Sequence, residues 1–330
     1  MGPRTRLAGI IGDPVRHSLS PVMHNAAFQA LGLDWAYLAF EVAEGNAHGA
    51  IEGARALGLV GLSVTMPHKA AAAGVVDRLS PVALALGAVN TVVRLPGDVL
   101  EGDNTDGVGF LDSIRQDEGF DPAGRRCLVV GAGGAARAVV KALAGAGAGT
   151  VVVVGRTPPR AAAAAALADG VGRVGTISEA AEADLVVNAT PVGMAGVTRS
   201  VAEVRSIDGD RDGDGGHGRG EDADADASVV EAALLGPGQL VVDLVYNPLV
   251  TPLVHAARSR GATAVSGLGM LIHQAAHAFR LWTGEDPPLA VMSAAAMAEM
   301  ARVSAGMARA TAGLGRVAAE PGRVAAEPST

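Results

Sequence analysis

The chain has 330 residues, 49% of them hydrophobic and only 3% aromatic, so one large or two medium domains must have a core built mainly from Ala, Val and Leu. The net charge of −8 argues against nucleic-acid partners and anionic membrane surfaces. The single cysteine, Cys127, excludes an internal disulfide, and no apolar run is long enough for a signal peptide or a membrane span, so we expect a cytoplasmic protein.

The first predicted domain covers residues 1–111. Short apolar runs, which we expect to be strands, alternate here with helical patterns. The expected strands are Leu7–Ile11, Tyr37–Val42, Gly61–Val64 and Val89–Arg94, and the expected helices are Pro21–Leu31 and Ala47–Ala56. This alternation is typical of βαβ units and predicts an α/β domain with a mainly parallel sheet.

The second predicted domain covers residues 112–267 and repeats the βαβ pattern. A helix is expected at Arg137–Ala144, after a glycine-rich turn. The expected strands are Cys127–Val130, Val151–Val154, Leu185–Asn188 and Leu240–Leu244. A stretch at about 198–228 is rich in Asp and Gly with almost no apolar content, which predicts a disordered acidic insertion.

The third segment is helical, from about Gly267 to Arg302. After it, the sequence GRVAAEP occurs twice, at 315–321 and 322–328. Two short copies that end in proline cannot stack into a core, so residues 306–330 are predicted to be a flexible tail.

A glycine-rich turn follows the strand that contains Cys127. Gly131, Gly133 and Ala136 form the pattern GxGxxA. The first glycine permits a tight turn, the second lets the backbone approach a pyrophosphate, and the third small residue allows close packing of helix on strand. The phosphates would lie at the helix N-terminus. The alternative is a tight turn without a ligand.

The end of the next strand bears on which dinucleotide binds. An enzyme specific for NAD usually has an acidic residue there for the ribose 2′-hydroxyl. This chain has GRTPPR at 155–160, with no acid and with two arginines, Arg156 and Arg160. Two guanidinium groups can clamp a 2′-phosphate, so the sequence favours NADP. The alternative is a pair of solvated surface arginines.

Four short polar runs lie in the first domain, at loops after predicted strands or at the helices that follow. Open α/β sheets bind ligands at such positions. Hydroxyl, amide and carboxylate groups in this number suit a substrate with several hydroxyls and a carboxylate. The runs are SLS from Ser18, SVTMPHK from Ser63, AVNT from Ala88 and GDNTDG from Gly102.

Lys69 ends the second of these runs and is one of only two lysines among 26 basic residues. Since Lys can exchange a proton near neutral pH and Arg cannot, a lysine retained against this bias indicates a chemical role. Oxidation of a secondary alcohol needs a group that removes the hydroxyl proton as hydride leaves. The alternative is an ordinary surface ion pair.

Together these motifs resemble the shikimate dehydrogenases of the shikimate/quinate dehydrogenase family. The resemblance implies a substrate domain and an NADP-binding Rossmann domain, with C-terminal helices 268–305 that return to complete the first domain. It implies NADP-dependent interconversion of 3-dehydroshikimate and shikimate, in the biosynthesis of aromatic amino acids. The motifs are HSLSP, SVTMPHK, GAVNT, GDNTDG, GAGGAAR, GRTPPR, NATPVGM, DLVYNP and GLGMLIHQAAHAF.

The resemblance also implies roles for individual residues, carried over motif by motif. Lys69 and Asp106 match the catalytic pair, and no metal site is expected. The implied substrate-binding residues are Ser18, Ser20, Thr65, Asn90, Tyr246 and Gln274. The implied cofactor-binding residues are Gly131, Gly133, Gly134, Ala135, Arg156, Thr157, Arg160, Thr190, Gly267 and Met270.

Two positions depart from the family pattern. Ser63 replaces the usual Asn, and Gly155 replaces the usual Asn of the NRTxxR motif. The change at Ser63 leaves open a quinate or aminoshikimate dehydrogenase. A noncatalytic NADP-binding regulatory protein is the alternative from another class. The expected partner is a small-molecule substrate, with the chain acting as a monomer or homodimer.

Overall fold

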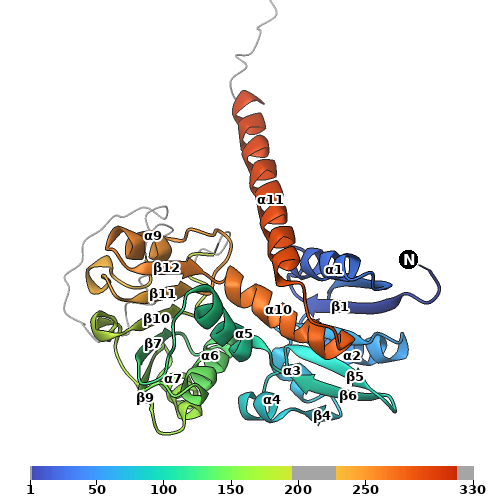
Figure 1. Cartoon of the computed structure of the whole chain (residues 1–330), viewed down its shortest axis with the longest axis horizontal. Coiled ribbons are helices and arrows are strands. Elements are labelled where there is room, and N and C mark those ends of the chain that lie inside the picture. Colours follow the sequence, from blue (N-terminus) through green and yellow to red (C-terminus); the bar gives the residue numbers. More distant parts are fainter. Residues whose placement is uncertain (1, 195–227, 318–330) are drawn as a thin grey trace, which may run out of the picture.

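Two six-stranded sheets, each flanked by helices, organise the computed structural model (Figure 1). The structure describes residues 2–194 and 228–317, with side chains up to residue 305. The acidic insertion predicted at about 198–228 therefore lies almost wholly outside the described residues. Within the described ranges, no helix is both long enough and apolar enough to cross a membrane.

The first sheet has the strand order β2-β1-β3-β5-β6-β4. Three of its five pairings are parallel, while β5 runs antiparallel to both β3 and β6. The sheet is thus mainly parallel, as predicted, with one antiparallel hairpin inserted. The strands are β1 (Arg6–Gly12), β2 (Trp35–Glu41), β3 (Gly61–Val64), β4 (Arg78–Leu79), β5 (Thr91–Leu95) and β6 (Val99–Asp103).

Four helices accompany this sheet. In α1 a proline stands in the first turn, as predicted. In α4 the hydroxyl of Ser80 accepts a hydrogen bond from the backbone N–H of Ala83, and Gly87 ends the helix in the left-handed conformation. The helices are α1 (Ser20–Ala30), α2 (Ala47–Ala56), α3 (Lys69–Ala73) and α4 (Pro81–Leu86).

The second sheet is wholly parallel, with the order β12-β11-β10-β7-β8-β9. The chain order reverses between β7 and β10, as in doubly wound dinucleotide-binding folds, and ligands bind at such a reversal. The Rossmann prediction is confirmed. The strands are β7 (Arg126–Val130), β8 (Thr150–Val154), β9 (Gly172–Val174), β10 (Leu185–Asn188), β11 (Leu240–Asp243) and β12 (Thr263–Ser266).

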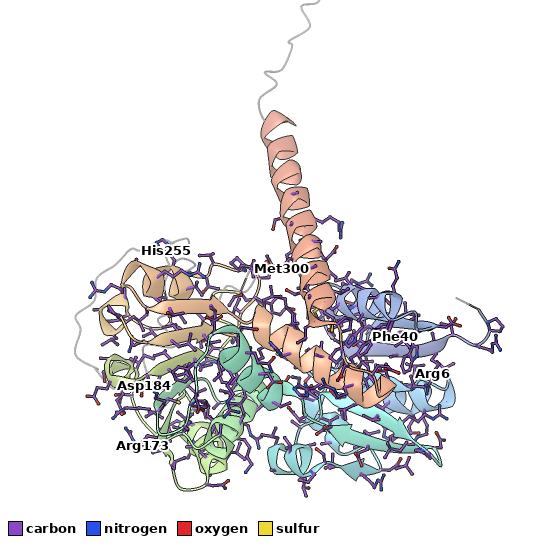
Figure 2. The ribbon with its side chains drawn as sticks, in the orientation of Figure 1. Arg6, Phe40, Arg173, Asp184, His255 and Met300 are labelled. Carbon is purple, nitrogen blue, oxygen red and sulfur yellow. The ribbon has the colours of Figure 1, made fainter. Side chains whose placement is uncertain are left out.

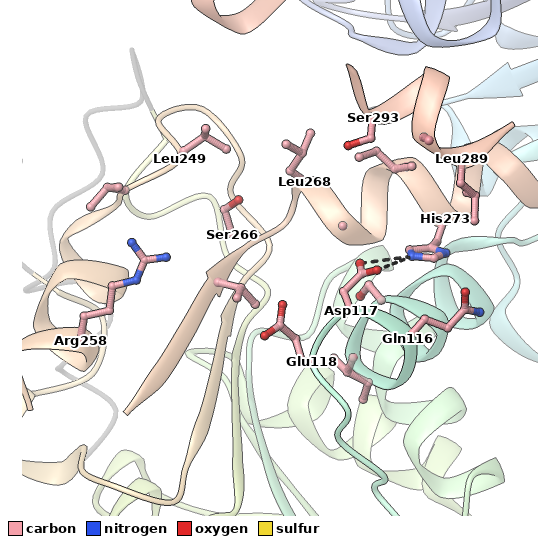
Figure 3. Close-up of a pocket in the computed structure, with 17 residues that line it drawn as sticks. Gln116, Asp117, Glu118, Leu249, Arg258, Ser266, Leu268, His273, Leu289 and Ser293 are labelled. Carbon is pink, nitrogen blue, oxygen red and sulfur yellow. Dashed lines mark hydrogen bonds and ion pairs between the residues drawn. The ribbon is translucent and has the colours of Figure 1, made fainter. Parts of the chain in front are cut away.

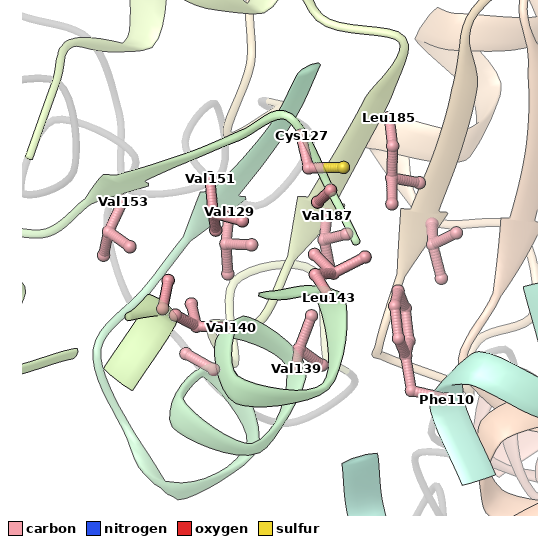
Figure 4. Packing of buried hydrophobic residues seen from close by; sticks show 14 of the residues in the cluster. Phe110, Cys127, Val129, Val139, Val140, Leu143, Val151, Val153, Leu185 and Val187 are labelled. Atoms are coloured by element: carbon pink, nitrogen blue, oxygen red, sulfur yellow. The ribbon is translucent and has the colours of Figure 1, made fainter. Parts of the chain in front are cut away.

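Valines fill the space between this sheet and helix α6 (Gly134–Gly145) (Figure 4). Val129 and Val151 on the strands lie in one buried cluster with Val139 and Leu143 on the helix. Cys127 belongs to the same cluster, and its burial raises the pKa of the thiol to about 12. A thiol that is protonated at neutral pH is a poor nucleophile, so Cys127 acts here as a small hydrophobic residue of the core.

The remaining helical segments of the second domain cover both faces of its sheet. They are α6 (Gly134–Gly145), α7 (Pro158–Ala165), the short 3₁₀ helices η2 (Ala166–Ala168), η3 (Ile177–Glu182) and η6 (Ala232–Leu234), and α9 (Pro252–Ser259).

Charged side chains lie at the periphery (Figure 2). Arg173, on the edge strand β9, pairs with Glu179, and Asp184 accepts a hydrogen bond from the backbone N–H of Arg126 at 2.8 Å. Charges on an edge strand disfavour pairing with a second chain.

Two connections join the domains. α5 (Asp106–Asp112) continues into a π-helical turn, η1 (Ser113–Asp117), and leads to β7, while α10 (Leu268–Thr283) returns from β12. α5 and α10 pack tightly: a Cβ on Gly109 would lie 2.5 Å from the backbone nitrogen of Gln274. The predicted boundaries, at 111/112 and 267/268, fall at these connections and stay predictions.

The C-terminal helices pack on the first domain, as predicted. Phe279 and Trp282 of α10 and Met292 of α11 (Leu289–Val317) share a buried cluster with Phe28 and Tyr37. α11 continues to Val317 and extends away from the body of the molecule (Figure 1), so helix replaces the first part of the predicted flexible tail. An alanine-rich sequence without proline explains this continuation.

Candidate active site

Lys69 and Asp106 form the centre of the site. Lys69 begins α3 after β3, and Asp106 begins α5 after β6, so both lie at one edge of the first sheet. The ammonium Nζ lies 2.6 Å from Oδ2 of Asp106. The lysine side chain is 21% exposed and that of Asp106 only 8%. This burial distinguishes the pair from an ordinary solvated ion pair.

Asn90 fixes the carboxylate of Asp106. Its Nδ2 donates to Oδ1 of Asp106 at 2.8 Å, so each carboxylate oxygen has one donor. The Oδ1 of Asn90 accepts from the backbone N–H of Thr105 at 2.9 Å. Asn90 precedes β5 instead of following a strand, but β5 is antiparallel to β3, and its start therefore lies at the same edge.

Gln274 reaches this network from α10. Its Oε1 lies 3.5 Å from the hydroxyl of Thr105, and its Nε2 donates to the carbonyl of Leu271 at 2.9 Å. Thr105 is buried, as is Asn104, whose Oδ1 accepts from the backbone N–H of Asp106 at 3.1 Å. Neither residue was predicted as part of the site, although both belong to the GDNTDG run.

Ser18 and Ser20 lie where α1 begins. The hydroxyl of Ser18 accepts from the backbone N–H of Ser20 at 3.2 Å. Close by, the phenol of Tyr37 donates to the hydroxyl of Ser63 at 2.7 Å and also interacts with Ser20. Burial raises the pKa of Tyr37, so the phenol stays neutral. Tyr37 was not predicted, because its contacts join separate strands.

Thr65 lies at the same edge of the first sheet as Lys69 and Asp106. It follows β3 directly, and its backbone N–H donates to the carbonyl of Ile11 at 3.0 Å. This hydrogen bond holds the turn between β3 and α3 in place, and Lys69 is the first residue after that turn.

Tyr246, Gly267 and Met270 lie at or after the ends of β11 and β12. Tyr246 is half-buried beside the C-terminal helices, and burial raises the pKa of its phenol. A Cβ on Gly267 would lie 2.1 Å from the carbonyl oxygen of Leu244, so only glycine fits there. Met270 is buried in the core cluster of the second domain.

The glycine-rich turn after β7 has the geometry of a phosphate site. Gly131 has φ +121°, and a Cβ there would lie 2.9 Å from the carbonyl of Ala189. A Cβ on Gly133 or Gly134 would meet no described atom within 4 Å, so the start of α6 faces open space. Its unpaired N–H groups and positive helix end favour an anion there. Ala136 is buried against the sheet, as GxGxxA packing requires, while Ala135 is half-buried.

One buried donor supports the same interpretation. Nε of Arg137, in the first turn of α6, has no hydrogen-bond partner among the described residues. An unsatisfied guanidinium donor beside the turn fits a bound phosphate.

The residues after β8 and β10 lie at the same edge as the glycine-rich turn, because the three strands are parallel neighbours. Arg156, Thr157 and Arg160 are exposed at the start of α7. Thr190 follows β10, and its hydroxyl donates to Oδ1 of Asn188 at 2.7 Å. The donors and cations at this edge fit a phosphorylated dinucleotide, and no carboxylate stands between 155 and 160.

No group of three or more His, Cys, Asp or Glu side chains in the described residues is placed to hold a metal ion. His68 contacts the carbonyl of Val42 at 2.7 Å, His273 contacts Asp117 and His277 contacts Asp112. These contacts give the histidines structural partners.

Three family models match the chain in consecutive segments. Residues 10–92 match the shikimate dehydrogenase substrate binding domain, residues 115–206 match shikimate/quinate 5-dehydrogenase, and residues 267–297 match the shikimate 5′-dehydrogenase C-terminal domain. The chain is 44% identical over 302 residues to the NADP-dependent shikimate dehydrogenase of Moorella thermoacetica, an alignment that covers 87% of this chain and 91% of that protein.

Solved structures of the same family are also similar to this chain. The shikimate 5-dehydrogenase of Thermus thermophilus, in complex with NADP(H) and shikimate, has a TM-score of 0.75 and 37% identity, covering 88% of this chain and 98% of that one. The quinate dehydrogenase of Corynebacterium glutamicum, in complex with NAD, has a TM-score of 0.74 and 31% identity, covering 89% of this chain and 99% of that one.

Proposed function

Because the chain belongs to the shikimate/quinate dehydrogenase family, we propose that it catalyses the NADP-dependent interconversion of 3-dehydroshikimate and shikimate. The observation that carries the proposal is the partly buried Lys69–Asp106 pair at the edge of the substrate domain, where α10 returns from the dinucleotide domain.

Lys69 moves the proton in the proposed reaction. In the direction of reduction, Nζ donates a proton to the oxygen that develops negative charge as the ketone becomes an alcohol. In the direction of oxidation, the neutral amine accepts the proton of the hydroxyl group. The bond from Nζ to Asp106 at 2.6 Å holds the lysine in place.

Asp106 acts through its charge and its fixed orientation. Its Oδ2 accepts from Lys69 while Asn90 holds Oδ1, so the carboxylate cannot rotate without breaking a charge-assisted hydrogen bond. The negative charge of the carboxylate, 2.6 Å from Nζ, holds the ammonium group of Lys69 at the centre of the site. Preorganisation of this kind avoids reorienting the pair during reaction.

The substrate would lie against the polar groups around this pair. We assign the carboxylate of the substrate to Ser18 and Ser20 at the start of α1, with Tyr246 at the same end. The ring hydroxyls are assigned to Thr65, Asn90, Asp106 and Gln274, whose amide and hydroxyl groups donate or accept as each substrate oxygen requires.

NADP, when bound, accepts or supplies the hydride. The start of α6, at Gly133, Gly134 and Ala135, would hold the pyrophosphate, with Gly131 forming the turn. Arg156, Thr157 and Arg160 would hold the 2′-phosphate, and Thr190 borders the same edge. Gly267 and Met270 would orient the nicotinamide.

Quinate dehydrogenase is the second candidate, and Ser63 favours it. Quinate has an additional ring hydroxyl, and a serine leaves more space than the asparagine usual in the family. A quinate dehydrogenase in complex with NAD is among the structural relatives. The absence of an acid after β8 weighs against NAD and against this alternative. A noncatalytic NADP-binding protein would have no use for the Lys69–Asp106 pair.

Initial rates followed by absorbance of the reduced nicotinamide decide between these activities. Shikimate and quinate are each assayed with NADP and with NAD. Strong turnover with shikimate and NADP alone supports the proposal. A preference for quinate supports the second candidate, and nucleotide binding without turnover on either acid supports a regulatory protein.

A further inference from the structure

An open cavity of about 620 Å³ lies beside α10 (Figure 3). Six segments contribute to its wall: η1 with Glu118 directly after it, the end of β12, α9, the start of α10, the loop after β11 and the start of α11. Its volume is in the range of small-molecule sites.

The cavity is separate from the candidate active site. Gly269, Ile272 and His273 of α10 line it, whereas Gln274 points to Thr105 on the active-site side. Neither Lys69 nor Asp106 borders it, and neither does the glycine-rich turn after β7.

One wall of the cavity is apolar. Leucine and isoleucine side chains from three different segments line it, and Val250 on the loop after β11 is 52% exposed. An exposed valine beside a concave apolar wall has surface left to bury against a ligand. The larger aliphatic side chains of this wall are Leu249, Leu268, Ile272 and Leu289.

Charged side chains also reach the cavity, and one pair is already satisfied. Nε2 of His273 donates to Asp117, with both carboxylate oxygens at 3.2 Å. Glu118 has no hydrogen-bond or ion-pair partner in the part of the chain that the structure describes. Partial burial of its carboxyl group, together with the nearby charge of Asp117, raises the pKa of Glu118.

Arg258 faces Glu118 from the opposite side of the cavity (Figure 3). Its Nε and Nη2 donate to the carbonyl of Ala264 at 3.0 and 2.8 Å, which holds the guanidinium in place and leaves Nη1 for another acceptor. Arg258 and Glu118 are close enough to attract each other and too far apart to form an ion pair. A positive and a negative group are thus held apart in one cavity.

We propose that this cavity binds an α-amino acid with a large apolar side chain. The ammonium group contacts Glu118, the carboxylate contacts Nη1 of Arg258, and the side chain packs on the wall formed by Leu249, Leu268 and Leu289. A zwitterion supplies both charges at once, and a large apolar side chain adds burial on the wall that glycine, which has no side chain, lacks.

The position of the cavity gives such a ligand a means to act on the enzyme. η1 carries the chain from the first domain to the second, and the start of α10 carries it back. A ligand that touches both connections stabilises one relative placement of the domains, and by linkage it changes affinity for ligands bound between them.

Isothermal titration calorimetry on the full chain tests the proposal, with L-phenylalanine, L-leucine and glycine as probes. Phenethylamine lacks the carboxylate, and 3-phenylpropionate lacks the ammonium. We expect L-phenylalanine or L-leucine to bind saturably, and glycine and both single-charge analogues to bind about tenfold or more weakly.

Variants locate the site. Glu118→Gln and Arg258→Gln should each weaken binding about tenfold or more, while Glu44→Gln and Arg260→Gln, which change the same charges outside the cavity, should leave it unchanged. No saturable heat up to about 10 mM, equal binding of phenethylamine, or binding unaffected by both cavity variants overturns the proposal. Because binding is measured directly, these outcomes do not depend on whether shikimate is the substrate.

Discussion

At the scale of single residues, the polar network around Asp106 explains why a few side chains decide the chemistry. Lys69, Asn90 and Asp106 come from three segments, yet each oxygen of the Asp106 carboxylate has a donor within 2.8 Å. The sequence predicted these three residues, because they belong to short family motifs that lie beside strand ends at one edge of the sheet. Thr105 and Tyr37 escaped prediction because their contacts join residues distant in the chain.

Replacing Lys69 tests the proton transfer. We expect Lys69→Ala to lower kcat by about 10²- to 10⁴-fold with a smaller change in KM for shikimate, because the lost interaction acts on the developing alkoxide. Steady-state rates with NADP measure both constants. Lys141→Ala is the matched control, since the only other lysine forms an exposed pair with Asp169. Near-native turnover in Lys69→Ala would remove the lysine from the mechanism.

Tyr37→Phe tests whether the phenol positions the substrate-binding hydroxyls. The variant removes the donor that holds Ser63 and leaves the ring in the core. We expect KM for shikimate to rise about three- to tenfold, with kcat and KM for NADP nearly unchanged, since one neutral hydrogen bond is lost. Full kinetics with each substrate varied separate these constants. A fall in kcat alone contradicts a positioning role.

At the scale of elements, the close approach of α5 and α10 holds the active site together. Asp106 starts α5 and Gln274 lies on α10, so the spacing of the two helices sets the distance across the site. The sequence predicted β7, β8, β10 and β11 well, because buried parallel strands are continuous β-branched runs. It missed β4, β6, β9 and β12, which are short or carry polar residues and glycine and so resemble loops.

Gly109→Ala should separate the two helices. A Cβ would lie 2.5 Å from the backbone nitrogen of Gln274, and backbone cannot move aside cheaply. We expect a loss of about 1–3 kcal/mol in the free energy of unfolding, measured by urea denaturation, and weaker turnover. In α2, a Cβ on Gly53 would meet no described atom within 4 Å, so Gly53→Ala should be neutral or stabilising. Equal stability of the two variants would show that the helices can adjust.

At the scale of the whole molecule, the domains are joined twice, and their cores differ. The dinucleotide domain has a core of Val and Ala, while most aromatic side chains gather where α1 meets α10. The sequence indicated both domains and, through the family resemblance, the returning helices. The sequence did not indicate the cavity beside α10, because six segments distant in the chain form the wall of the cavity and no motif marks them.

The aromatic cluster makes stability depend on pH. His24 stacks on Tyr37 with ring centroids 4.4 Å apart, and burial lowers its pKa from 6.5 to about 3. Between these values the unfolded chain binds a proton that the folded chain excludes, so stability falls as the pH falls. Urea denaturation from pH 6.5 to 4 should show wild type losing up to about 1.4 kcal/mol per pH unit more than His24→Leu.

Asp243 changes stability with pH in the direction opposite to His24. Its contribution is the same in wild type and in His24→Leu, so it cancels when the two profiles are compared. Burial raises the pKa of Asp243 from 3.8 to about 6, so the folded state binds the extra proton and stability rises as the pH falls through that range. The wild-type profile alone therefore understates the contribution of His24. Parallel profiles for wild type and His24→Leu would show that the histidine is protonated in the folded state.

Because the chain has only two lysines, chemical modification of Lys69 can report whether a ligand occupies the active site. A reagent that acylates amines finds only two side-chain targets, one paired on the surface and one 21% exposed beside Asp106. The rate at which Lys69 is acylated, relative to Lys141 in the same molecule, then serves as an internal gauge by mass spectrometry. Every ligand that covers the site can be ranked by the protection it gives to Lys69, without any turnover.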